Sequence, residues 1–322
     1  MKTILCTNLY KGIPLQIMED LRPQGFQFLF PDAQTQEELC QKIVGADYLL
    51  AGGRLRITAD VLANAGRLRM IQRSGVGLDA LDLEAIREKG IPLYVNQGVN
   101  AESVAEHALL LMLACLRRLP MIDAQTKSGV WKKQEQGVQT AELCGKTVGL
   151  VGMGNVARRL VSLLKPFGVK ILYSNLFRES AGYEAENNMT FLTTDEVLRG
   201  ADIVSLHCAL TDETRRLINA RSLSGMKDGA ILINTARGEI VDAQALAEAL
   251  RSGKLACAGI DVHEREPIPD RYPLKTADNV ILTPHIAGVT ADSFRAMMRD
   301  AFRNIALFDQ GRLDEIEPFR YL

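Results

Sequence analysis

Residues 146–175, KTVGLVGMGNVARRLVSLLKPFGVKILYSN, constrain the fold more than any other part of the chain. They read as a short apolar strand, a G-x-G-x-x-A turn, a helix with apolar residues at helical spacing, and a second strand. In such a turn Gly152 permits a tight backbone, Gly154 lets a pyrophosphate approach, and Ala157 lets the helix pack against the strand. The helix start also offers unpaired N–H groups to a phosphate. Because the turn lies between two strands, it predicts a βαβ unit that binds a dinucleotide.

The composition is that of a globular protein and excludes several classes. The 322 residues suffice for two domains, and hydrophobic residues make up 47% of the chain. A net charge of -1 argues against a nucleic-acid-binding or polybasic membrane surface, so the expected partners are small molecules or a second copy of the chain. The N-terminus lacks the apolar run of a signal peptide, and residues 108–116, the best apolar segment, are too few to span a bilayer. We therefore expect a soluble cytoplasmic protein.

Cysteine and histidine usage speaks against a metal centre. The six cysteines are scattered without a CxxC pair, and only four histidines are present to share a metal. The chain also has no HExxH motif. This pattern predicts reduced thiols in the core and no metal site.

Strand and helix patterns alternate on both sides of the central unit, which indicates parallel sheets. Before it, short apolar strands are expected at residues 3–5, 26–29, 48–50, 70–72 and 92–95. After it, strands are expected at residues 203–206, 231–234, 256–261 and 280–282. The four later strands and the two central strands make a doubly wound sheet of about six strands. The predicted fold class is α/β.

Three helical or polar segments lie between and after these strands. Asn100 is expected to cap a long helix to about residue 118, with His107 on its apolar stripe as a buried structural histidine. Residues 120–145 are polar and contain Trp131, so we expect a connecting arm. The last helix carries an apolar stripe that includes Phe294 and Met298, so it must dock on another element.

Two glycine loops follow strands in the first domain, at residues 51–54 and 74–77. Neither continues as G-x-G-x-x-G, so neither is expected to be a second dinucleotide site. Ligands of open α/β sheets bind beyond the carboxyl ends of strands, so a small carboxylate could bind to the backbone N–H groups of these loops. Plain turns explain the same residues equally well.

Three strand ends in the second domain carry polar residues where a doubly wound sheet binds its ligand. They are residues 234–238, 261–267 and 283–288. Each alone reads as a solvated loop, but three that face one crevice favour a site. If the crevice holds a nicotinamide, hydride transfer to a 2-oxo acid needs a cation for the carboxylate and carbonyl and a proton donor for the new hydroxyl.

Arg237, His285 and Glu266 suit these two roles. Arg237 binds oxyanions through its planar fork and stays charged. His285 titrates near neutral pH, and Glu266 beside it would raise its pKa. His263 and Glu264 on the same loop are rivals that residue type alone does not exclude. His207 also ends a strand and fits either a cofactor contact or a structural role.

Taken together, these motifs resemble the D-isomer-specific 2-hydroxyacid dehydrogenase family, which contains phosphoglycerate dehydrogenase and the glyoxylate and hydroxypyruvate reductases. The resemblance runs nearly end to end and rests on residues 74–79, 100–106, 152–157, 234–238, 261–262 with 266–267, and 283–285. It implies an oxidoreductase that transfers a hydride between NAD(P)(H) and a small 2-oxo or D-2-hydroxy acid. The implied fold has two Rossmann-like doubly wound domains. The dinucleotide-binding domain, residues 99–287, would be inserted into a discontinuous substrate domain, residues 1–98 and 288–322.

The resemblance also implies roles for individual residues. His285 would be the catalytic acid/base, Glu266 its partner, Arg237 the substrate binder, and Asp261 would lie near the nicotinamide carboxamide. The implied substrate contacts are Gly52, Gly53, Ser74, Gly75, Val76 and Arg237. The implied cofactor contacts are Ser103, Gly152, Gly154, Asn155, Val156, Asn175, Arg178, His207, Thr214, Thr235, Ala236, Asp261, His285 and Gly288. The last helix would complete the first domain, and the arm and the long helix would form a homodimer.

Departures from the family pattern bear on specificity. NAD-specific members usually end the second strand with an aspartate that binds the adenosine ribose, and Asn175 stands there instead. Without that acid a 2′-phosphate is not repelled, and Arg178 could pair with it, so NADP is favoured and NAD stays the alternative. Ala209 stands where many relatives have proline. The Gly52-Gly53-Arg54 loop differs from the usual hydroxyl-bearing loop, which leaves the substrate open.

Two other classes use similar elements. A dinucleotide-sensing regulator resembling the C-terminal-binding-protein corepressors shares the fold and the Arg, Glu and His set. We expect no long polar tail for partner recruitment after the last helix, which weighs against that class. An S-adenosylmethionine-dependent transferase would use the same glycine turn but would have no use for the three polar residues.

Overall fold

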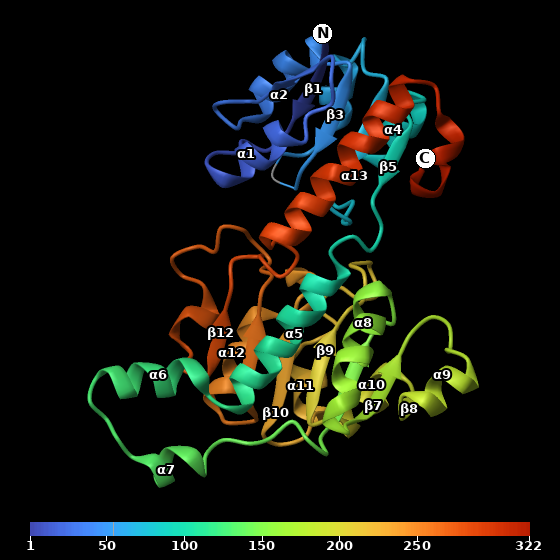
Figure 1. Cartoon of the computed structure of the whole chain (residues 1–322). Helices are drawn as coiled ribbons and strands as arrows, with labels where there is room; N and C mark the ends of the chain where they lie inside the picture. The colour runs from blue at the N-terminus through green and yellow to red at the C-terminus, as the bar shows by residue number, and fades with distance from the viewer. Residues whose placement is uncertain (54) are drawn as a thin grey trace. The chain divides into compact units, whose positions relative to one another are not determined.

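The computed structural model describes residues 1–53 and 55–322, so Arg54 of the first glycine loop lies outside the described residues. The chain divides into two compact units, Met1–Asn100 with Val289–Leu322, and Ala101–Gly288 (Figure 1). The domain boundaries expected from the sequence, 98/99 and 287/288, lie beside these unit boundaries and stay a prediction. Within the described part of the chain, no helix is long and apolar enough to cross a membrane.

Unit 1 is built on a five-stranded parallel sheet in the order β2-β1-β3-β4-β5. The strands are β1 (Lys2–Cys6), β2 (Phe26–Leu29), β3 (Tyr48–Ala51), β4 (Met70–Arg73) and β5 (Leu93–Val95). The central strands β3 and β4 are buried along their whole length, as expected of strands covered on both faces. Alternate residues of β3 enter different cores: Leu49 packs on one face and Tyr48 on the other.

Helices cover both faces of this sheet. They are α1 (Ile13–Asp20), α2 (Gln36–Lys42), η1 (Ile43–Gly45), α3 (Ala59–Ala63), α4 (Leu83–Glu88), α13 (Ala291–Asp309), η5 (Leu313–Glu315) and η6 (Glu317–Phe319). One core contains residues of α2, α3 and α4, and the other contains residues of α1 and α13. The apolar stripe of α13 is buried there through Phe294, Met298 and Phe302, so the last helix docks on the first unit as expected. Its start is fixed by a capping box between Thr290 and Ser293.

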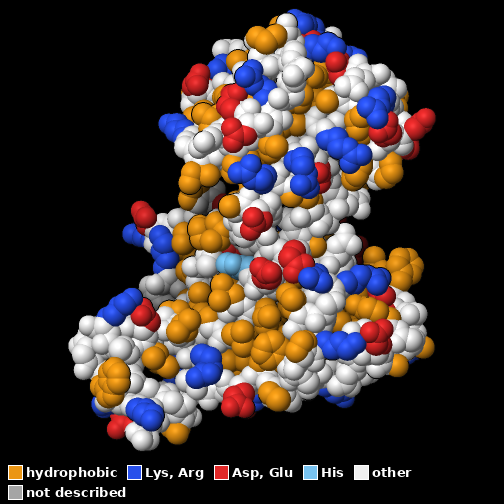
Figure 2. All heavy atoms as spheres, in the orientation of Figure 1, with side chains coloured by type: hydrophobic (Ala, Val, Ile, Leu, Met, Phe, Trp, Pro, Cys, Tyr) orange, Lys and Arg blue, Asp and Glu red, His pale blue; other side chains and the backbone are white. Residues whose placement is uncertain are grey.

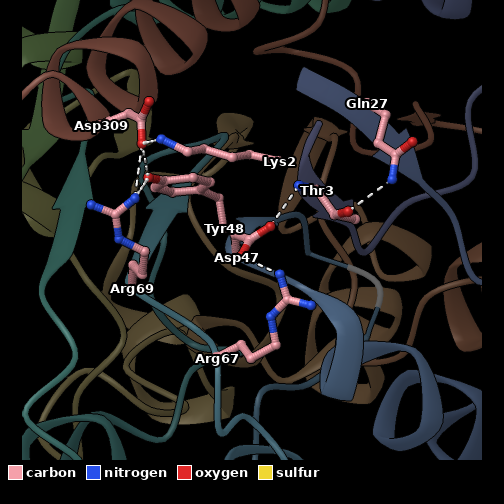
Figure 3. Close-up of polar contacts among 8 residues, drawn as sticks. All are labelled: Lys2, Thr3, Gln27, Asp47, Tyr48, Arg67, Arg69 and Asp309. Atoms are coloured by element: carbon pink, nitrogen blue, oxygen red, sulfur yellow. Dashed lines mark hydrogen bonds and ion pairs between the residues drawn. The ribbon is translucent and has the colours of Figure 1, made fainter. Parts of the chain in front are cut away.

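A polar cluster fixes the far end of α13 at the amino ends of the strands (Figure 3). Asp309 accepts hydrogen bonds from the Tyr48 hydroxyl at 2.7 Å and from Arg69 at 2.8 Å, and it pairs with Lys2. Burial raises the pKa of Asp309, but the three hydrogen bonds from Lys2, Tyr48 and Arg69 outweigh it and lower that pKa overall. Beside it, Asp47 accepts from Arg67 at 2.8 Å.

Unit 2 is built on a seven-stranded parallel sheet in the order β12-β11-β10-β9-β6-β7-β8. The strands are β6 (Thr147–Val151), β7 (Lys170–Ser174), β8 (Met189–Phe191), β9 (Ile203–Leu206), β10 (Ala230–Asn234), β11 (Leu255–Ile260) and β12 (Val280–Leu282). The expectation of about six strands was one strand short. The missed edge strand β8 has three residues, of which only Met189 is buried, so no apolar run marks it.

Helices cover both faces of the second sheet too. The helices of this unit are α5 (Ala101–Leu116), α6 (Leu119–Lys127), α7 (Lys133–Gly137), α8 (Asn155–Leu164), η2 (Lys165–Phe167), α9 (Ala181–Glu186), α10 (Thr194–Gly200), α11 (Ala220–Gly225), η3 (Gly238–Ile240), α12 (Ala243–Arg251) and η4 (Pro273–Thr276), of which α6 and α7 have no buried residue. Helices α5 and α8 lie across one face, as Figure 1 shows, and residues of α10, α11 and α12 form the core on the other. The segment expected to be a connecting arm contains two helices, α6 and α7.

Candidate functional site

The glycine turn after β6 fits the geometry that a dinucleotide needs. Gly152 has a φ of 96°, and a Cβ built on it would lie 2.7 Å from the backbone of both His207 and Cys208. Only glycine fits this position. A Cβ on Gly154 would meet nothing within 4 Å, so space is open beside this residue. Gly154 is the N-cap of α8 and provides no side-chain cap, which leaves the first N–H groups of Asn155 and Val156 for an anion.

The end of β7 carries the residues expected to contact the adenosine ribose. The Asn175 carboxamide accepts weakly from Met153 N at 3.4 Å and donates to Phe177 O at 3.1 Å. The Arg178 guanidinium makes two hydrogen bonds to Glu184, at 2.9 and 2.8 Å. Hydrogen bonds from Arg178 and Tyr173 lower the pKa of Glu184 to about 2. Arg178 is therefore held by a carboxylate, although its side chain is 63% exposed.

His207, Thr214 and Ser103 occupy three different surroundings in unit 2. The His207 ring Nε2 lies 2.9 Å from Ser205 Oγ, and desolvation lowers the pKa of His207 to about 4, so the ring is neutral at pH 7. Thr214 closes a turn by donating to Ala209 O at 2.7 Å. Ser103 lies in the first turn of α5.

The turn after β10 is organised by Asn234, which is fully buried. Its amide donates to Arg237 O at 2.9 Å, and its side-chain oxygen accepts from Ala236 N at 3.0 Å. Within this turn the Thr235 hydroxyl is buried without a hydrogen-bond partner. A buried hydroxyl without a partner is costly, so a polar ligand group that reaches it is stabilised. The unpaired Thr235 hydroxyl and the open space at Gly154 are thus the two features of these turns that suit a dinucleotide.

Gly238 fixes the position of the Arg237 turn against the loop after β11. A Cβ on Gly238 would lie 2.0 Å from the backbone carbon of His263, so the two loops touch through their main chains. The Arg237 guanidinium donates to Ala236 O at 2.7 Å. Its charge also lowers the pKa of His285, against the larger effect of Glu266. The turn and the loops after β11 and β12 thus lie at one place in unit 2.

Asp261, at the end of β11, organises the loop after β12. Its buried carboxylate accepts from Thr283 Oγ1 at 2.5 Å, from Ile286 N at 3.0 Å and from Ala287 N at 2.9 Å. Its main-chain oxygen accepts from His285 N at 2.7 Å. These bonds hold His285 at a φ of 56°, a left-handed conformation that a residue with a side chain adopts only when its surroundings impose it.

His285 and Glu266 form a hydrogen-bonded pair. His285 Nδ1 lies 2.8 Å from Glu266 Oε2, and half of the His285 side chain is exposed. The hydrogen bond to Glu266 raises the pKa of His285 more than burial lowers it. Burial raises the pKa of Glu266, but the hydrogen bonds from His285 and from His263 N outweigh this and lower it. The pair therefore favours an imidazolium held by a carboxylate.

The rivals on the loop after β11 are differently placed. Both ring nitrogens of the buried His263 are engaged: Nδ1 lies 3.3 Å from the Tyr272 hydroxyl, and Nε2 lies 3.0 Å from Thr283 O. Glu264 is exposed as a residue. Partial desolvation of its carboxyl group and the charge of Asp242 raise the pKa of Glu264, against the charge of Arg216, which lowers it. His107, expected to be structural, is mostly buried, with Nε2 3.1 Å from Thr283 Oγ1.

The substrate-contact candidates of unit 1 are backbone loops packed on buried polar side chains. Gly52 N donates to Thr7 Oγ1 at 2.6 Å, and a Cβ on Gly52 would lie 2.4 Å from the Asn8 carboxamide. Ser74 donates to Ala51 O at 3.1 Å. The remaining candidates are Gly53, Gly75 and Val76. A Cβ built on Gly53 or on Gly75 would lie within 4 Å of an Arg73 nitrogen, and Val76 is 39% exposed.

Two positioning residues were not singled out from the sequence. Asn234 shapes the Arg237 turn, and Thr283 bridges Asp261 and His107. Asn234 ends the buried strand β10, Thr283 directly follows β12, and this position at a strand end was the available signal. Within the described residues, no group of three or more His, Cys, Asp or Glu side chains is arranged to hold a metal.

Comparison with known proteins gives the family. The model of the "D-isomer specific 2-hydroxyacid dehydrogenase, NAD binding domain" matches residues 109–287, more than half of the chain. The hydroxypyruvate reductase of Thermotoga maritima is 39% identical over 81% of this chain and 84% of its own length. The glyoxylate reductase of Thermofilum pendens is also 39% identical, over 87% of this chain and 83% of its own. The structure of D-lactate dehydrogenase from Aquifex aeolicus, complexed with NAD and lactic acid, aligns with a TM-score of 0.86 at 28% identity, covering 99% of this chain and 98% of that one.

The chain belongs to the D-isomer-specific 2-hydroxyacid dehydrogenase family. It is an oxidoreductase that uses NAD(P) and acts on 2-hydroxy acids, as its motifs led us to expect.

Proposed function

We propose that this enzyme reduces small 2-oxo acids of the glyoxylate and hydroxypyruvate type to D-2-hydroxy acids, with His285 as acid and Arg237 as substrate binder. The observation that carries the proposal is the 2.8 Å contact between His285 Nδ1 and Glu266, made by a histidine held in a left-handed conformation. A hydroxypyruvate reductase and two glyoxylate reductases stand among the relatives at 38–39% identity.

The chemistry divides between the cofactor and the side chains. When bound, the nicotinamide supplies or takes up the hydride. His285 gives a proton to the carbonyl oxygen of the 2-oxo acid, and its Nε2 is the donor because Nδ1 is held by Glu266. Glu266 stabilises the imidazolium and fixes the orientation of the ring. Arg237 holds the carboxylate and polarises the carbonyl with its planar fork.

We propose that Gly152, Gly154 and the start of α8 hold the pyrophosphate, with Thr235 and Asp261 closer to the nicotinamide. The support is the close approach of the Gly152 backbone to His207, the open space at Gly154 and the unpaired Thr235 hydroxyl. In unit 1 we propose that the N–H groups around Gly53 and Gly75 bind the substrate carboxylate, as backbone donors at the carboxyl ends of strands do elsewhere.

We propose that NADP is preferred over NAD, and that Asn175 rather than Arg178 is the reason. Asn175 carries no charge to repel a 2′-phosphate, whereas Nε and Nη2 of Arg178 are already bonded to Glu184. Asn175→Asp should lower the NADPH/NADH ratio of kcat/KM by about tenfold, equivalent to ~1.4 kcal/mol. Arg178→Met is the matched control and should change the ratio much less. A larger effect of the arginine would reverse the assignment.

We also propose that the active form is a homodimer joined through α5, α6 and α7. Leu110, Leu119, Trp131 and Val138 are all more than half exposed, and a groove of about 510 Å³ runs between these helices. Figure 2 shows hydrophobic side chains gathered on the part of unit 2 that carries α5 and α6. Exposed apolar patches of this kind mark protein contacts. Light scattering of wild type and of Trp131→Glu tests it: a monomeric wild type contradicts the proposal.

The reaction is tested by initial rates of NADPH and NADH oxidation against glyoxylate, hydroxypyruvate, pyruvate and bulkier 2-oxo acids. Turnover of the first two supports the proposed substrate class. A strong preference for a bulkier acid contradicts the substrate class but leaves the roles of Arg237 and His285 intact. Dinucleotide binding without turnover of any acid would favour the dinucleotide-sensing regulator.

A further inference from the structure

Helix α5 and strand β11 run in opposite directions, and every fourth residue of the helix lies opposite every second residue of the strand. Near the carboxyl end of β11, His107 Nε2 lies 3.7 Å from Asp261 Oδ1. One step back, a Cβ on Gly259 would lie 2.9 Å from Leu111 Cβ. Each step spans four helical residues, about 6 Å, against two strand residues, about 6.6 Å.

The next step of the same series brings Cys115 opposite Cys257. Cys257 shares a strand face with Gly259, and both cysteines are buried in the core beneath α5. These matched steps place the two side chains opposite each other in the same core, and the interaction of the two thiols raises the pKa of Cys115 and lowers that of Cys257. The charge of Arg118 further lowers the pKa of Cys257. Two cysteines that lie opposite each other across a helix and a strand meet the first requirement for a disulfide.

A cavity of about 430 Å³ lies beside this pair. Its lining includes Cys115 itself, the neighbouring Arg118, and Ala256 next to Cys257. Lys146 and Lys227 line it together with Asp202 and Asp228, and Lys227 is paired with Asp202 at 2.8 Å, so Arg118 is the cation that acts on Cys257. Positive charge beside a thiol favours the reactive thiolate. The cavity is far larger than a water-sized oxidant needs.

We propose that Cys115 and Cys257 form a redox-active pair that a peroxide converts into a reversible disulfide joining α5 to β11. The Cys257 thiolate attacks one oxygen of hydrogen peroxide, the O–O bond breaks, and the departing hydroxide takes up the thiol proton as water, leaving a sulfenic acid. The Cys115 sulfur then attacks this sulfur, the S–O bond breaks, and water leaves with the Cys115 proton. The two sulfurs lose two electrons, and the peroxide is reduced to two waters.

The test uses the full chain, reduced and then treated with hydrogen peroxide at low molar excess. Cleavage after Lys and Arg places Cys115 in residues 90–117 and Cys257 in residues 255–265, with no other cysteine in either peptide. We expect the two peptides to be joined with the loss of two hydrogen atoms, and free thiols to fall from six to four, restored by dithiothreitol. The oxidised chain should run as a monomer on a non-reducing gel, because the bond lies within one chain.

Three variants separate this pair from general oxidation. Cys115→Ser and Cys257→Ser should each lose the joined peptide, whereas Cys144→Ser, which removes an exposed cysteine, should keep it. The wild-type result does not depend on how well the buried variants fold. The proposal is overturned if peroxide oxidises Cys40 or Cys144 while residues 90–117 and 255–265 stay separate and alkylatable. It is also overturned if the two peptides join only after the chain is unfolded in urea.

Discussion

The two units are both parallel α/β sheets, yet they present their candidate residues in different ways. In unit 1 the loops after β3 and β4 offer mainly backbone around Gly53 and Gly75, packed on the buried side chain of Arg73. In unit 2 the loops after β10, β11 and β12 present charged side chains whose conformations are fixed by Asn234 and Asp261. Backbone donors bind an anion without changing charge, whereas side chains that titrate can move protons. We therefore expect substitutions in unit 1 to alter binding or folding and substitutions in unit 2 to alter the chemical step.

The largest effect should come from His285 in unit 2. His285→Ala removes the proposed proton donor, and kcat should fall by about 10²- to 10⁴-fold. Dinucleotide affinity, measured by fluorescence titration with NADPH, should stay within about twofold because the Gly152 turn is untouched. Unchanged turnover would show that His285 is not the proton donor. It would also contradict the division of binding and chemistry between unit 1 and unit 2.

Glu266 should set the pH range of the reaction. The reduction needs His285 protonated, and Glu266 raises the pKa of His285 above its ordinary value of 6.5. Activity should therefore be full at low pH and be lost as pH rises through that higher value. In Glu266→Gln the midpoint should move to lower pH, with about a tenfold loss of kcat/KM at pH 8 and a smaller loss at pH 6. A midpoint that does not move would show that Glu266 acts only in folding.

In unit 1, Gly53→Ala should raise KM for the 2-oxo acid by about tenfold, the cost of one added carbon in a tight site, and leave kcat nearly unchanged. The new Cβ lies 3.7 Å from Arg73, an ordinary contact, so folding should not suffer. Gly45→Ala is the matched control, because a Cβ there meets nothing within 4 Å and the residue lies in η1. A fall in kcat without a change in KM for Gly53→Ala would place chemistry, not only binding, in unit 1.

The smallest effect concerns stability of unit 1. Asp309→Asn weakens the cluster with Tyr48 and Arg69, and should lower the free energy of unfolding by about 1 kcal/mol at pH 7. The folded-state pKa of Asp309 is below its ordinary value of 3.8, so its contribution is present above pH 3.8 and is lost as pH falls through the folded-state value. Urea unfolding at pH 7 and at pH 3 should show the difference shrinking in acid. A constant difference would mean that the carboxylate charge does not matter.

Local patterns predicted much of the fold. The apolar runs of β6 and β9 are buried along nearly their whole length, and the stripe of α13 is docked in unit 1 as expected. The patterns failed where packing rather than periodicity decides. The three residues of β8 carry no apolar run, and neither α6 nor α7 has a buried residue, so no stripe identified them.

The candidate site was predictable only in part. Polar residues after strands pointed to the loops that hold Arg237, Glu266 and His285, and the family is confirmed. Sequence position could not separate His263 from His285, because what distinguishes them is which ring nitrogens are bonded inside the protein. The placement of Cys115 opposite Cys257 depends on the match of helical and strand rise between distant segments, which no local pattern carries. The roles of the individual residues stay predictions.

The return of α13 to unit 1 determines when each part of the chain can fold during synthesis. Unit 2 is one continuous stretch, Ala101–Gly288, and all of its core is available once that stretch has left the ribosome. The strands of unit 1 emerge before unit 2, but one of its two cores contains Phe294, Met298 and Phe302, which are made only after unit 2. That sheet face is therefore covered only in part, by α1, while unit 2 forms, so the unit whose strands are made first is completed last.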